Sequence, residues 1–139
     1  MGDACAARVS FVIAGKQAAM AAADEQEALR VAADQSAARS ANERMRTLVI
    51  RERFEPTQRV PFLCECADRS CSEIVMLSLR EYERLREYPR RFLLVAGHED
   101  AEAAYERIIE AENGYAIVEK VGPAGVEAAR LNPRQPERA

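Results

Sequence analysis

The chain has 139 residues, of which 48% are hydrophobic and 31% charged, and its 20 basic and 23 acidic side chains give a net charge of −3. This composition is typical of one globular domain with extensions and excludes a disordered or fibrous chain. The acidic balance argues against general electrostatic binding to nucleic acid, and the apolar runs are too short for a membrane span. The single histidine excludes any mechanism that needs two.

The N-terminal part, residues 1–55, is predicted to be an alanine-rich helical extension. No glycine or proline occurs in residues 16–55, and alanine is the strongest helix former. The apolar stripe along this helix is thin. We therefore expect a solvated helix that docks only its last turns, near residues 45–54, and a domain that stays folded without residues 1–40.

A seven-residue spacing within this helix suggests a partner. Val31, Ala38 and Met45 recur every seven residues, as in one seam of a coiled coil. Asp34 and Asn42 interrupt that seam, which weakens the pattern. A homodimer through the N-terminal helix is therefore an alternative hypothesis to the solvated helix.

Residues 56–122 are predicted to form a small α+β domain with the order β-β-α-β-α-β. Ser78 and Glu81 form a capping-box pattern at the start of its first helix. The predicted strands are 60–65, 73–77, 92–96 and 115–121, and the predicted helices are 78–88 and 99–112. Residues 123–139 are predicted to be a loose C-terminal tail. A compact part of this size buries a modest core and often needs a covalent or metal staple.

The charged residues around the first of these helices are predicted to lie on a solvated face. Five arginines alternate there with glutamates, so mutual pairing is favoured over phosphate binding. These arginines are Arg80, Arg84, Arg86, Arg90 and Arg91. The nearby apolar residues Tyr82, Leu85, Tyr88 and Phe92 are predicted to pack in the core.

A cysteine cluster carries the chemistry of this sequence. Cys64, Cys66 and Cys71 form the pattern C-x-C-x4-C. Residues two apart on a strand point to one face, and the following polar loop can return Cys71 to the same point. His98 lies in a Gly-His turn and can complete a tetrahedral set of three thiolates and one imidazole. The sequence therefore predicts a structural Zn²⁺ site at Cys64, Cys66, Cys71 and His98, which staples the first hairpin to the start of the predicted helix 99–112.

Several other residues are alternatives to His98 as the fourth ligand. Asp68, Glu73, Glu99 and, distantly, Cys5 are the alternatives to histidine. A disulfide or redox pair is the alternative to a metal. Glu65 is predicted to point to the face opposite Cys64 and Cys66, and the Pro-Cys-x-x-Cys element of a zinc deaminase is missing, so no catalytic residues are predicted.

Several short patterns between residues 41 and 121 occur together. They are Ala41-Asn42-Glu43-Arg44, Val60-Pro61-Phe62 before the cysteines, Glu81-Tyr82-Glu83 followed by Arg86 and Arg91-Phe92, Gly97-His98-Glu99, and residues 115–121. With them the chain resembles a family of small, largely uncharacterised actinobacterial proteins with a C-x-C-x4-C plus Gly-His motif. Ala96 departs from the proline or polar residue usual before Gly-His in that family. The resemblance implies the four candidate ligands but no activity, substrate or partner.

These observations predict a non-enzymatic zinc-binding domain that acts as a protein-interaction or regulatory module with a protein partner. The alternative is a thiol-based redox or metal sensor, since oxidation releases metal from thiolates. A nucleic-acid-binding zinc module is disfavoured by the acidic domain. The apolar segment 9–14 is too short for a secretory signal, so we expect a cytoplasmic protein with reduced thiols and no membrane attachment.

Overall fold

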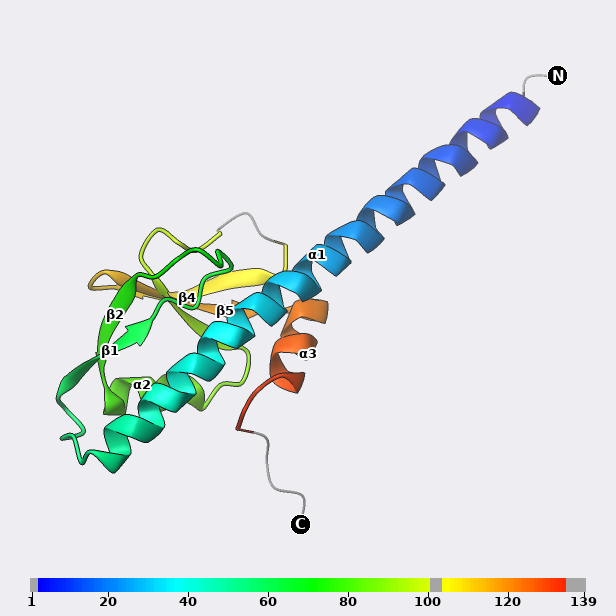
Figure 1. The fold of residues 1–139 in the computed structure, drawn as a ribbon. Coiled ribbons are helices and arrows are strands. Elements are labelled where there is room, and N and C mark those ends of the chain that lie inside the picture. Colours follow the sequence, from blue (N-terminus) through cyan, green and yellow to red (C-terminus); the bar gives the residue numbers. More distant parts are fainter. Residues whose placement is uncertain (1–2, 101–103, 135–139) are drawn as a thin grey trace, which may run out of the picture.

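The α+β class and the long N-terminal helix are confirmed by the computed structural model, which describes residues 3–100 and 104–134, with the side chains of the first helix described from residue 23 on (Figure 1). The elements are α1 (Asp3–Arg51), β1 (Arg59–Leu63), β2 (Ile74–Ser78), α2 (Leu79–Arg86), β3 (Arg91–Val95), β4 (Glu106–Glu112), β5 (Tyr115–Lys120) and α3 (Gly122–Arg130). The strands form two antiparallel sheets, the hairpin β1-β2 and the sheet β3-β5-β4. Helix α3 lies beside α1, which also runs along the hairpin (Figure 1).

The predicted hairpin and the helix after it are confirmed. β1 pairs with β2 so that Val60 and Phe62 face inward opposite Leu77 and Val75. Phe62 stacks on Tyr82 of α2 with ring centroids 4.2 Å apart. The Ser78 side chain accepts a hydrogen bond from the Glu81 backbone, and the Ser78 N–H donates to the Glu81 carboxylate, which is the predicted capping box.

The predicted helix 99–112 is wrong, because residues 106–112 form strand β4. Asn113 and Gly114 both have positive φ angles, 48° and 86°, and join β4 to β5 as a two-residue turn. Asn-Gly is a strong hairpin signal because both residues tolerate this backbone, whereas the sequence interpretation took the pair as a helix C-cap. The element order after α1 is therefore β-β-α-β-β-β-α.

The predicted loose tail is also wrong for residues 123–130, which belong to α3. Pro123 occupies its first turn, where a missing N–H costs nothing. Ala124, Gly125 and Ala128 are buried, and a Cβ on Gly125 would lie 2.7 Å from the Lys120 carbonyl oxygen. Small side chains thus let α3 pack closely against α1 and the end of β5.

Helix α1 enters the core earlier than predicted, and its buried face is polar. Among the described side chains, burial begins at Ala32 and includes Gln35, Ser36, Arg39 and Asn42. In the last turns Val49 is buried in the core, whereas Leu48 and Ile50 are exposed. The expectation that only residues 45–54 dock is contradicted by this packing. The packing also reaches into the segment 1–40, which the sequence analysis expected the folded domain not to need. The sequence shows no clear hydrophobic stripe on the docked face of α1, because most of that face consists of polar side chains that bond specific partners.

Arg39 shows how a buried polar residue of α1 is accommodated in the core. Its side chain is fully buried, donates to the carbonyls of Pro89 at 2.7 Å and Ala128 at 2.8 Å, and lies 4.6 Å from the ring centroid of Phe92. The Ala128 carbonyl belongs to α3, so Arg39 links α1 to that helix and to the turn before β3. Burial lowers the pKa of Arg39 to about 10.

Glu65 and Arg86 form a buried ion pair at the junction of the hairpin, α1, α2 and β3. Both Glu65 oxygens accept from Arg86, and further donors are the Asn42 amide at 2.7 Å and the Leu93 N–H at 2.9 Å. Asn42 also bonds both the N–H and the carbonyl of Leu63. Burial alone would lower the pKa of Arg86, but the Glu65 charge raises it. Arg86 is therefore a core residue, not part of the predicted solvated face.

Replacing Arg86 by methionine is expected to lower the free energy of unfolding by about 3–5 kcal/mol, because the Glu65 carboxylate would stay buried without its counter-charge. Arg84→Met removes an exposed arginine two residues away and should change stability by at most about 0.5 kcal/mol. Chemical denaturation of the metal-loaded protein measures both. Equal stabilities for the two variants would contradict the structural role of the pair.

Candidate metal centre

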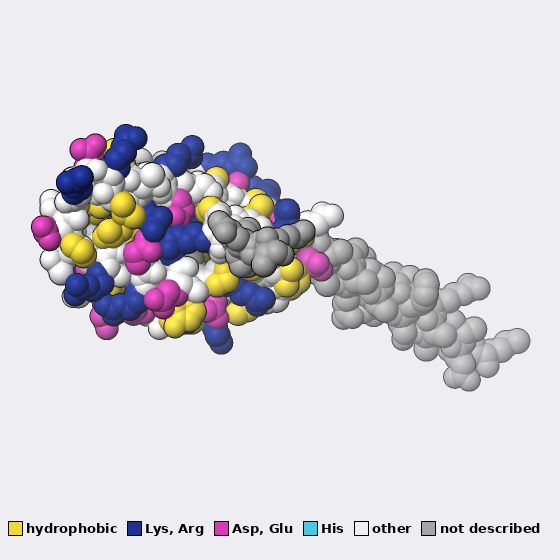
Figure 2. All heavy atoms as spheres, turned by 90° about the horizontal axis from the view of Figure 1, so that it is seen from below, with side chains coloured by type: hydrophobic (Ala, Val, Ile, Leu, Met, Phe, Trp, Pro, Cys, Tyr) yellow, Lys and Arg dark blue, Asp and Glu magenta, His cyan; other side chains and the backbone are white. Residues whose placement is uncertain are grey.

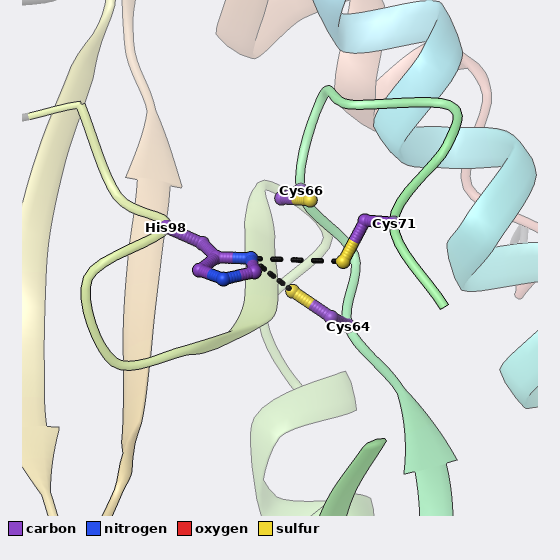
Figure 3. Close-up of side chains that lie close together, drawn as sticks. All are labelled: Cys64, Cys66, Cys71 and His98. Carbon is purple, nitrogen blue, oxygen red and sulfur yellow. Dashed lines mark hydrogen bonds between the residues drawn. The ribbon is translucent and has the colours of Figure 1, made fainter. Parts of the chain in front are cut away.

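The four predicted ligands converge at one point (Figure 3). Cys64 and Cys66 directly follow β1, Cys71 lies further along the same loop before β2, and His98 lies in the turn after β3. Strand β1 ends at Leu63, so the cysteines lie on irregular backbone and not on the predicted strand. Their ligand atoms nevertheless all lie within 4.8 Å of one another.

Local hydrogen bonds shape the two segments. The Cys64 N–H donates to the Glu73 carbonyl at 2.9 Å and the Cys71 N–H to the Asp68 carbonyl at 3.0 Å, which closes the cysteine loop. Gly97 has a φ of 94°, and the next N–H, of His98, donates to the Val95 carbonyl at 3.0 Å. Glycine adopts this left-handed backbone readily, and the resulting tight turn directs the imidazole toward the sulfurs.

The distances fit a tetrahedral ion. His98 Nδ1 lies 3.5 Å from Cys64 Sγ and 3.6 Å from Cys71 Sγ (Figure 3). Metal–sulfur and metal–nitrogen bonds of about 2.3 and 2.05 Å at a tetrahedral angle place the sulfur and nitrogen about 3.6 Å apart. The described side chains are thus compatible with a metal ion held by three sulfurs and one nitrogen, and Nδ1 is the histidine atom that faces it.

The second nitrogen of His98 identifies a residue whose role the sequence did not predict. His98 Nε2 lies 2.5 Å from the Glu73 carboxylate. Metal-binding histidines commonly donate their other N–H to a carboxylate, which fixes the tautomer and the ring orientation. Glu73, which was an alternative ligand in the sequence, therefore supports the imidazole from outside the cluster. The position of Glu73 in the sequence does not indicate that its carboxylate lies next to the ring of His98.

The other alternative ligands have different contacts. The Asp68 carboxylate accepts from the N–H and hydroxyl of Ser70 at 2.9 and 2.6 Å, and the Glu99 carboxylate accepts from the Gly97 N–H at 2.8 Å. Glu65 points away from the sulfurs to Arg86, as predicted. Cys5 lies outside the residues whose side chains are described.

Cys64 and Cys66 lie in an environment that favours their protonated form until a cation binds. Burial raises the pKa of Cys64 to about 12 and also raises that of Cys66. The Val95 N–H donates to Cys64 Sγ at 3.2 Å and partly opposes this effect. A divalent cation that displaces these protons would supply the missing positive charge. His98 is 30% exposed, so one side of the cluster reaches solvent.

No protein-family model matches the sequence, and comparisons with curated proteins and with solved structures found no match. Within the part of the chain that the structure describes, no helix has the length and apolar character needed to cross a membrane.

Metal affinity is expected to rise steeply with pH, because the raised pKa values of Cys64 and Cys66 mean that each thiol must lose a proton to bind. Three thiol ligands that each lose a proton on binding give about a 1000-fold rise in affinity between pH 6.5 and pH 7.5. Competition with a chelator of known affinity measures it. Cys66→Ser should lower the number of protons released by one, and a pH-independent affinity would exclude thiolate ligation.

Removing the carboxylate behind the imidazole is expected to weaken metal binding without abolishing it. Glu73→Ala should lower zinc affinity by about 10- to 100-fold, with Glu73→Gln between this variant and the wild type. Glu87→Ala, which removes an exposed carboxylate on the end of α2, is the matched control. If Glu73→Ala binds zinc as Glu87→Ala does, Glu73 does not position His98.

Proposed function

We propose that this protein is a non-enzymatic, zinc-stapled domain that serves as a protein-interaction or regulatory module. The observation that carries the proposal is the arrangement of three sulfurs around His98 Nδ1, with two sulfur–nitrogen distances of 3.5 and 3.6 Å. Three thiolates and one imidazole are a standard set for structural zinc. With four protein ligands, the shell has no open position for a substrate, which supports a structural ion over a catalytic one.

Zinc would join two parts of the chain that do not share a sheet. The cysteine loop belongs to the β1-β2 hairpin, whereas His98 follows β3 of the other sheet. Cys64 and Cys66 also pack with the buried side chains of Phe92, Leu94 and Val118 in the hydrophobic core. Metal bound here would convert part of its binding free energy into stability of this small core.

The mixture of side chains on the surface favours a protein partner over a nucleic acid. Basic and acidic side chains are interspersed with apolar ones on the face shown in Figure 2. The outer face of the hairpin exposes Leu63, Ile74 and Met76, with Leu63 directly opposite Ile74. Together with the net charge of −3, these features favour contact with another protein.

A second candidate function is a thiol-based redox or metal sensor. Cys71 is only partly buried, and a cavity of about 330 Å³ is lined by all three cysteines. A peroxide could reach the cluster there, oxidise two thiolates to a disulfide and be reduced to water, with release of the metal.

The freshly purified, reduced protein is expected to contain one zinc per chain. His98→Ala should weaken zinc binding by more than about 100-fold, because it removes a direct ligand, and Cys66→Ser should weaken it further. His98→Cys should retain most of the metal, since four thiolates are also a standard tetrahedral set. Elemental analysis and chelator competition measure these values.

Well under half an equivalent of zinc in reduced protein would overturn the proposal. If His98→Ala keeps its zinc and melts like the wild type, a carboxylate or water fills the fourth position. Zinc release by low peroxide concentrations, reversed by a thiol reductant and accompanied by a change of shape, would favour the sensor over the structural module.

A further inference from the structure

A second cavity lies beside the metal centre, and the candidate ligand His98 is part of its wall. Its volume is about 530 Å³, within the usual range for small-molecule sites. Four alanines from different parts of the chain line it, and their small side chains leave the space open. They are Ala28 of α1, Ala67 of the cysteine loop, Ala104 before β4 and Ala124 of α3.

Gln35 of α1 contributes a buried amide to the cavity wall. Its side chain is 2% exposed, and its Oε1 has no hydrogen-bond partner among the described residues. A buried carbonyl oxygen without a donor costs about 1–3 kcal/mol. The oxygen is enclosed in the structure, so the amide must turn about its terminal torsion, which is broad in glutamine, to present the oxygen to a donor in the cavity. The site therefore calls for a ligand that carries N–H or O–H groups.

The charge of the wall further specifies the ligand. The acidic residues Asp24, Glu27, Asp100 and Glu106 line the cavity, whereas Lys120 is its only lysine or arginine among the described residues. Lys120 is itself neutralised, because its Nζ donates to the Glu106 carboxylate at 2.6 Å and both side chains are 4% exposed. Glu27 is likewise paired, with Arg30 at 2.5 Å. Even with Arg30 counted, the acidic residues at the wall outnumber the basic ones, which favours cations over anions.

We propose that this cavity binds a small organic cation of the primary-amine class. An ammonium group offers three N–H donors and a positive charge, so it satisfies both the Gln35 oxygen and the carboxylates around it. The ring of His98 also lines the cavity. A bound amine would thus contact the same turn that carries the histidine ligand.

Isothermal titration calorimetry with three six-carbon probes of equal length tests the proposal. Hexane-1,6-diamine is expected to bind at least about tenfold more tightly than hexane-1,6-diol, and hexanedioate is expected not to bind. Metal content is measured on each sample, so loss of zinc and loss of the amine site are recorded separately. Equal binding of diamine and diol, or no heat from the diamine at millimolar concentration, would overturn the proposal.

Variants assign the binding to this cavity. Gln35→Leu should weaken diamine binding at least about tenfold, whereas Gln26→Leu, the same change at an exposed position of α1, should leave it unchanged. Ala28→Phe, at a partly exposed position, should block binding by filling the cavity and keeps the test valid if Gln35→Leu does not fold. Diamine binding that survives Ala28→Phe, or a lysine-bearing peptide that binds where the diamine does not, would overturn the small-ligand proposal.

Discussion

A buried carboxylate constrains much of this structure. Glu65 is fully enclosed, and an ion in that position is tolerated only with a counter-charge and a full set of donors. Arg86 supplies the charge, and Asn42 and the Leu93 backbone supply further hydrogen bonds. These partners come from α2, α1 and β3, so the requirements of one carboxylate bring three separate elements to the end of the hairpin.

The same short segment faces the candidate metal centre on its other side. Cys64 and Cys66 flank Glu65, and their sulfurs point to His98 while the carboxylate points to Arg86. Residues 64–66 are thus held on one side by the ion pair of Glu65 with Arg86 and on the other side by the cluster of candidate ligands. A metal ion would bind to a loop whose backbone the Glu65 interactions already position, which lowers the ordering cost of forming the site.

Polar packing also explains the role of α1. Arg39 and Asn42 replace the hydrophobic stripe that an amphipathic helix would present, and each bonds backbone groups of other elements. Such contacts depend on exact geometry, whereas apolar contacts tolerate repacking. This specificity suits a helix that must fit against both the hairpin and α3.

The sequence by itself determined the features that depend on local chemistry. The C-x-C-x4-C spacing and the Gly97-His98 turn identified all four residues of the cluster, the Ser78–Glu81 pattern identified the start of α2, and the absence of helix breakers identified α1. Each of these signals lies within a few residues, where spacing and backbone preference decide the outcome.

Only the tertiary structure decided what depends on residues far apart in the chain. Asn113 and Gly114 are compatible with a helix cap or a hairpin, and pairing of β4 with β5 selected the hairpin. The burial of Arg86 and the contact of Glu73 with His98 Nε2 each depend on a partner at least 21 positions away in the sequence. Charged residues appear exposed until a counter-charge is placed beside them, and that placement is a property of the fold.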